Sequence, residues 1–116
     1  MAAAEEIRDY PSVQTWFQGL REQWDEEPDD VDLRLEVLGR FCQFVERDPD
    51  TIIRECLREA EGGKRISIKG RRFFDERIRE FQASVVGDAR TQAQWGNMVR
   101  SFLIHNGIFL QSGLQM

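Results

Sequence analysis

The stretch DARTQAQWGNMVRSFLIHN, residues 88–106, carries the clearest helical pattern in the chain. Its large apolar residues recur at three- and four-residue steps, at Trp95, Val99, Phe102 and Leu103. This spacing places them on one face of an amphipathic helix and predicts that the face packs in the core. Asp88 stands at the position of an N-cap, and Asn106-Gly107 stands where such a helix ends.

The opposite side of the same helix is polar and basic. It brings together Arg90, Gln94, Asn97 and Ser101, with Arg100 at the edge. In the major groove of DNA, arginine pairs with guanine, and Gln or Asn pairs with adenine. No Asp or Glu follows Asp88 in the chain, so no carboxylate beyond the cap repels phosphate. The pattern predicts either a helix that reads DNA or an ordinary solvent-exposed face.

Three segments upstream share this helical periodicity. Residues 11–24 begin with Pro11-Ser12, and their apolar positions are Val13, Trp16, Phe17, Leu20 and Trp24. Residues 31–47 have a wider apolar stripe, made by Leu35, Val37, Leu38, Phe41, Cys42, Phe44 and Val45. A later helix, the fourth in chain order, is marked by Phe74, Ile78, Phe81 and Val85.

Between these segments, the pair Asp48-Pro49 predicts another helix start, with Asp48 as N-cap and Pro49 at the first helical position. This third helix has apolar positions at Ile52, Ile53, Cys56, Leu57 and Ala60, and Gly62-Gly63 closes it. No segment predicts a strand. We therefore expect an all-α fold, a compact bundle of four to five helices over residues 10–110. Residues 1–9 are expected to be a flexible terminus, and 111–116 a tail or the start of a linker.

Residues 62–72, GGKRISIKGRR, are expected to be the one irregular stretch. They contain no acid and five bases, which are Lys64, Arg65, Lys69, Arg71 and Arg72. Such a stretch either grips phosphates without regard to sequence or merely solvates a turn.

Charge is distributed unevenly along the chain, whose net charge is −5. Residues 1–50 contain 14 acids and 5 bases, whereas residues 51–116 contain 7 acids and 11 bases. The asymmetry favours one face that approaches phosphates and another that repels them, although an acidic, solvated N-terminal half is the plainer interpretation. Only two of the 16 bases are lysines. Many carboxylates with few lysines suggest a halophilic source.

Motifs for catalysis, cofactors and metals are not found in the sequence. The single histidine, His105, lies beside the predicted helix end, and the single tyrosine, Tyr10, has no basic cluster around it. The carboxylates of residues 26–30 are expected to be solvated. Cys42 and Cys56 fall at apolar helical positions, which predicts reduced, buried thiols in a cytoplasmic protein. No apolar run is long enough for a membrane span.

The order of these motifs resembles the core-binding, SAM-like N-terminal domain of tyrosine recombinases of the phage integrase type. The last helix of that domain is matched by Asp88, Thr91, Trp95, Val99, Arg100, Phe102 and Leu103. Upstream, FCQFVERDPDTII (residues 41–53) is similar to the family's Phe-x-x-Phe helix and the Asp-Pro helix that follows it. Residues 78–81, IREF, resemble its third helix. The chain departs from the family at Arg34 and Asp30, which replace an aromatic residue and a threonine.

The resemblance implies a domain that clamps double-stranded DNA during integration and recombination. The residues expected to contact DNA are those of the basic stretch and of the polar helix face that begins at Arg90 and Thr91. The resemblance also implies a C-terminal catalytic domain, absent from this chain, and recombinase protomers as partners on DNA. The alternative is a helical protein–protein adaptor, with Trp16, Trp24 or Phe109 in an exposed apolar patch.

Overall fold

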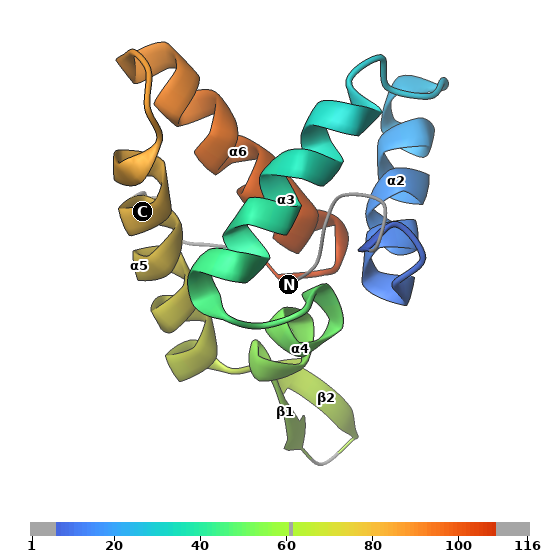
Figure 1. Ribbon diagram of the computed structural model, residues 1–116. Helices are drawn as coiled ribbons and strands as arrows, with labels where there is room; N and C mark the ends of the chain where they lie inside the picture. Colours follow the sequence, from blue (N-terminus) through green and yellow to red (C-terminus); the bar gives the residue numbers. More distant parts are fainter. Residues whose placement is uncertain (1–6, 61, 109–116) are drawn as a thin grey trace, which may run out of the picture.

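The computed structural model describes residues 7–60 and 62–108, and these are mostly helical (Figure 1). The helices are α2 (Pro11–Trp24), α3 (Val31–Val45), α4 (Pro49–Glu55), α5 (Ile68–Ser84) and α6 (Ala89–His105). A two-stranded antiparallel hairpin, β1 (Leu57–Ala60) and β2 (Gly63–Ile66), projects below α4 in the figure. The predicted helical class is confirmed, with a small sheet added.

Two predicted helix starts form as expected. An Asp48 carboxylate oxygen accepts a hydrogen bond from Thr51 N at 2.7 Å, and Asp88 accepts one from Thr91 N at 2.9 Å. Each bond satisfies one of the backbone donors that the first turn of a helix leaves without a partner. The bonds from Thr91 hold the pKa of the Asp88 carboxyl below its usual range.

The prediction of a helix from Pro49 to about residue 60 is wrong, because α4 ends at Glu55 and the chain turns into the hairpin. Gly62 and Gly63 have φ values of +87° and +126°, which L side chains rarely adopt. The two glycines therefore reverse the chain between two strands rather than closing a helix. Leu57 of β1 pairs with Ile66 of β2. The position of Leu57 in the sequence also fits a helical spacing, so periodicity alone does not reveal the strand.

The prediction that residues 62–72 are irregular is also wrong, because most of them belong to β2 or α5. Residues 63–66 form β2, and α5 begins at Ile68. The Ser67 hydroxyl caps α5 by accepting a hydrogen bond from Gly70 N at 3.0 Å. In the sequence, Ser67 is a possible N-cap, but no Glu or Gln stands three residues later to complete a capping box. The signal for a helix start at this position was therefore weak.

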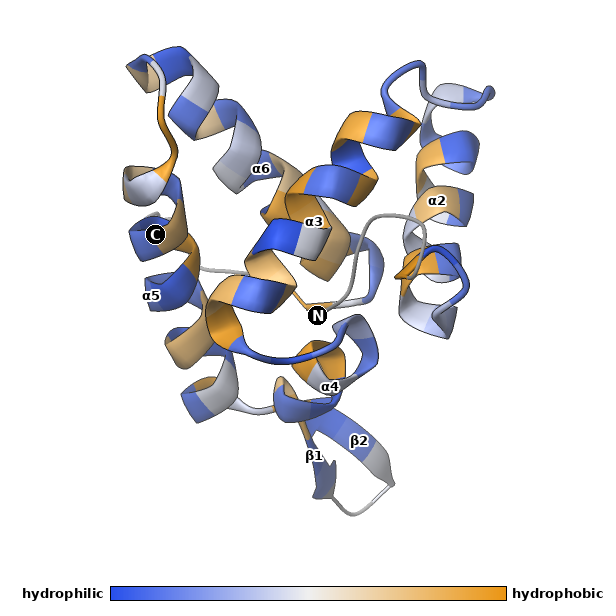
Figure 2. Ribbon diagram, viewed as in Figure 1, coloured by the Kyte–Doolittle hydropathy of each residue, from blue (hydrophilic) through white to orange (hydrophobic). Residues whose placement is uncertain are grey.

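The core lies where α2, α3, α5 and α6 meet. Its fully buried aromatic residues are Trp16, Phe41, Phe74 and Phe102. Trp16 packs edge-on against Phe102, with ring centroids 5.6 Å apart, and so joins α2 to α6. Figure 2 shows the apolar residues gathered on the inward sides of the helices, while the hairpin strands are largely hydrophilic.

Helix α6 is the central element, because it packs against α2, α3 and α5. At Gly96 it approaches α5 so closely that a Cβ atom would overlap the Gln82 side chain. The predicted core residues Val99, Phe102 and Leu103 are buried, and Trp95 is partly buried. Two aromatic residues predicted for the core lie at the surface instead: Trp24 is 61% exposed and Phe44 is 42% exposed.

The two cysteines are buried in this core, as the sequence predicts, and neither forms a disulfide. Burial raises the pKa of each thiol to about 12, with smaller contributions from Asp48 at Cys42 and from Glu55 at Cys56. Among the described residues, no helix is both long enough and apolar enough to cross a membrane.

Candidate nucleic-acid interface

The basic stretch forms one end of the molecule. Lys64 and Arg65 lie on β2, whereas Lys69, Arg71 and Arg72 lie in the first turns of α5. Lys64 is paired with Glu59 across the hairpin, with 3.5 Å between Nζ and the carboxylate. Arg65, Lys69 and Arg72 are exposed, and none has a carboxylate within ion-pair distance in the part of the chain that the structure describes.

Arg58 belongs to this basic end, although it lies outside the basic stretch of residues 62–72. It lies on β1 directly opposite Arg65, and both side chains are exposed. A helix continuing to residue 60 would have left Arg58 unrelated to Arg65. The available signal was the mirrored pattern Leu57-Arg58 and Arg65-Ile66 on either side of Gly62-Gly63, which is typical of a hairpin.

Only part of the predicted polar face of α6 points to solvent. Gln94, Asn97 and Arg90 are exposed. Ser101 is half-buried, and its hydroxyl oxygen accepts a hydrogen bond from Trp16 Nε1 at 3.0 Å. The placement of Ser101 opposite the core is therefore wrong, because α2 packs on that side of α6. Thr91 is half-buried and faces the cap at Asp88.

Arg100 is also held within the protein. One guanidinium nitrogen donates to Gln82 Oε1 and to Asn97 Oδ1, each at 3.1 Å. Burial lowers the pKa of Arg100, the charge of Asp75 opposes this shift, and the charge of Arg79 adds to it. The bond from Arg100 orients the Asn97 amide so that its oxygen faces Arg100. The NH₂ group of Asn97 remains available as a donor.

The exposed part of the α6 face borders a groove of about 530 Å³. Its far wall includes Trp24 and Gln23 from the end of α2. Asp30 also lines the groove, but its carboxylate is paired with Arg34 at 2.8 Å. Two arginines, three amides and an exposed indole thus line one concave surface, with the acidic turn of residues 25–30 beside it.

The basic end and the α6 face do not form one continuous surface. Helices α5 and α6 are joined by a short turn and pack against each other, so each begins where the other ends. In Figure 1 the hairpin lies at the bottom with the start of α5 near it, whereas the start of α6 lies at the top. The molecule measures 42 Å in its longest dimension.

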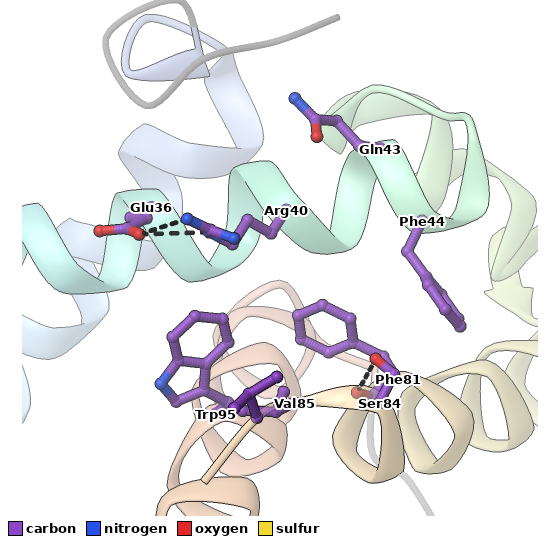
Figure 3. A pocket seen from close by; sticks show the side chains of 9 residues that line it. Glu36, Arg40, Gln43, Phe44, Phe81, Ser84, Val85 and Trp95 are labelled. Atoms are coloured by element: carbon purple, nitrogen blue, oxygen red, sulfur yellow. Dashed lines mark hydrogen bonds and ion pairs between the residues drawn. The ribbon is translucent and has the colours of Figure 1, made fainter.

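A second groove, of about 590 Å³, lies between α3 and the α5–α6 corner (Figure 3). Arg40 lies over the Trp95 ring at 5.7 Å and is held by Glu36 at 3.0 Å. Phe44 and Trp95 flank Phe81 at centroid distances of 5.6 and 6.2 Å. Val86, at the groove's edge, is 96% exposed.

Of the residues expected to form an apolar patch in an adaptor, Trp16 is fully buried and Trp24 is exposed. Phe109 lies outside the described residues. Phe44 and Val86 are also exposed and line the second groove, while Ile68 and Ile104 are exposed elsewhere.

His105 occupies the last position of α6 and packs against Gly19 of α2, where any side chain would overlap the imidazole. Partial burial lowers the pKa of His105, and the positive charge of Arg34 lowers it further. Within residues 7–60 and 62–108, no three His, Cys, Asp or Glu side chains lie close enough to hold a metal ion.

Comparison with protein-family models, with characterised proteins and with solved structures finds no match. The function is therefore inferred from the residues and geometry of this chain.

Proposed function

We propose that this chain binds duplex DNA and is the core-binding, SAM-like domain of a tyrosine recombinase, which clamps DNA during integration and recombination. Strand cleavage belongs to a separate C-terminal catalytic domain, and this chain contributes no catalytic residue. One observation carries the proposal: the exposed cations Arg65, Lys69 and Arg72 cluster at one end, without carboxylate partners among the described residues.

The rest of the fold shows why these unpaired cations are unusual. Although the chain has a net charge of −5, most arginines elsewhere pair with carboxylates, as Arg21 does with Glu27 and Arg79 does with Asp75. Among the described residues outside this end, Arg54, Arg90 and Arg100 form no ion pair. A group of cations that stays unpaired among so many acids suits an anionic partner outside the chain. Duplex DNA is such a partner, and binding it releases its condensed counterions.

The positions of the motifs also support the recombinase assignment. The Phe41 and Phe44 pair lies on α3, Asp48 caps α4, and the last helix begins at Asp88. At the departure from the family pattern, Asp30 is paired with Arg34, which offsets the charge that would repel phosphate.

Base recognition is assigned to the exposed residues of α6. Arg90, Gln94 and the free amide nitrogen of Asn97 offer the donors and acceptors that pair with base edges. Arg100 supports this surface from beneath, since it fixes Asn97.

A titration of labelled duplexes tests the proposal. The folded protein should bind unrelated duplexes at low salt, and the affinity should fall steeply as salt rises. Absence of binding to any duplex at low salt, with folding verified by thermal melt, would contradict it.

The groove at Phe44 favours a second candidate, a protein–protein adaptor. Exposed aromatic and aliphatic side chains around one hollow are typical of interaction sites. If the folded protein binds no duplex, and Phe44→Gln removes its binding to a partner protein, the adaptor function takes precedence.

A further inference from the structure

The outward face of the hairpin carries two arginines directly opposite each other. Arg58 of β1 pairs with Arg65 of β2 in the register, and both are exposed. The neighbouring pair, Leu57 and Ile66, is partly buried and packs against the core. Since side chains alternate between the two faces of a strand, Arg58 and Arg65 share the face turned away from the protein body.

This arrangement costs stability in the free protein. Residues directly opposite on antiparallel strands have Cα atoms about 5 Å apart, and like charges in such positions repel. In the described part of the chain, no carboxylate lies within ion-pair distance of either arginine. The adjacent cross-strand pair, Glu59 and Lys64, has opposite charges at 3.5 Å. The hairpin therefore has a cross-strand pair of opposite charges next to a cross-strand pair of like charges.

We propose that Arg58 and Arg65 form a phosphate clamp for the DNA backbone. Each guanidinium presents a planar set of donors that matches the oxygens of a phosphate group. Two such groups on one face hold a single phosphate, or two successive ones. The negative charge of the phosphate offsets the repulsion between the two guanidinium groups. Lys69 and Arg72, in the first turns of α5, extend the same positive region.

The shape of the hairpin favours duplex DNA over other anions, and here the inference rests on the proposed function. The two strands project from the helical body as a narrow ribbon (Figure 1). The major groove admits a two-stranded ribbon of this kind, with phosphates along both edges. An acidic peptide offers the same charge without the groove.

The test compares Arg58→Gln, Arg65→Gln and the double variant with the full chain. Arg21→Gln is the matched control, because it removes one exposed arginine charge from the last turn of α2. That end of α2 lies far from the hairpin in Figure 1. Duplex affinity is measured from 50 to 200 mM salt, and thermal melts are recorded without DNA. Each hairpin substitution should weaken duplex binding several-fold and reduce the salt slope by about 0.9, since one phosphate contact is lost. The melting temperature should stay the same or rise, because the repulsion is relieved. Arg21→Gln should bind like the parent.

Two further variants and probes make the outcomes distinct. Arg58→Lys keeps the charge and should retain most of the salt slope, so it serves if Arg58→Gln folds poorly. Duplex binding with an unchanged slope in both hairpin variants would overturn the clamp and leave the proposed function standing. Failure of the parent to bind any duplex overturns both. If poly-glutamate competes as well as duplex DNA of equal charge, the assignment to phosphate is wrong.

Discussion

Trp16 donates its indole N–H to the Ser101 hydroxyl at 3.0 Å, and this bond joins α2 to α6 beside the aromatic core. The indole is fully buried, so water cannot replace the serine as acceptor. A residue expected to meet DNA is therefore a structural contact between two helices.

The first prediction concerns Ser101. Ser101→Ala should destabilise the protein by about 1–3 kcal/mol, because it leaves the buried indole N–H without a partner. Chemical denaturation measures this loss, and DNA affinity per folded molecule should not change. Altered sequence selectivity with unchanged stability would return Ser101 to the DNA-reading face.

The misplacement of Ser101 shows what the sequence predicts and what it leaves open. The apolar periodicity located α2, α3 and α6, and residue type located the caps at Asp48 and Asp88. Both signals depend only on residues that are close together in the sequence. The surroundings of α6 are not local. The helix is covered by α2, α3 and α5, so its buried arc is wider than the stripe of large apolar residues.

The sequence pattern did not predict the hairpin, for a different reason. Leu57 and Ala60 continue the helical spacing of Ile52 and Ile53, and the spacing alone does not separate a short strand from a further helical turn. The pairing of Leu57 with Ile66 decides the outcome, and it depends on a chain reversal at Gly62-Gly63. Arg58 was missed as part of the basic end because its relation to Arg65 exists only in that pairing.

The second prediction concerns the contact between α4 and the start of α2. One Asp50 carboxylate oxygen accepts hydrogen bonds from Ser12 N at 3.0 Å and from the Ser12 hydroxyl at 2.6 Å. Asp50→Ala should cost about 1–3 kcal/mol, since it removes a charged acceptor from two partly buried donors. Urea denaturation provides the measurement, with Asp32→Ala as control because the Asp32 side chain is fully exposed. Equal effects of the two substitutions would contradict the role of Asp50.

The third prediction concerns the thiols. Because burial raises the pKa of Cys42 and Cys56 to about 12, alkylation of the native protein at pH 8 should be much slower than in urea. Their raised pKa values also predict that stability declines between about pH 9 and 12, where unfolded thiols ionise and folded ones do not. Mass spectrometry follows the alkylation. Rapid double labelling under native conditions would show that the thiols are accessible.

The fourth prediction concerns α6. Gln94→Ala should reduce discrimination at one base pair by about 1–3 kcal/mol, as expected for a lost bidentate contact. Asn97→Ala should reduce it by less, because the Asn97 amide oxygen is bound to Arg100 and only its nitrogen faces a base. Arg90→Ala should weaken binding more generally. Binding to a selected site and to a scrambled duplex is compared, with Gln14→Ala of α2 as control. If the folded triple variant keeps the parent's selectivity, α6 does not read DNA.

If the basic end binds the DNA backbone, its cations should control how the affinity for duplex DNA depends on salt. The parent is compared with a variant in which Lys64, Arg65, Lys69, Arg71 and Arg72 are replaced by Gln. The variant should bind every duplex more weakly, with a salt slope that falls by about 0.9 for each phosphate contact removed. Because Lys64 is already paired with Glu59, its share of this change should be the smallest of the exposed cations. A folded variant that retains the parent's affinity and salt slope would show that the basic end does not bind the DNA backbone.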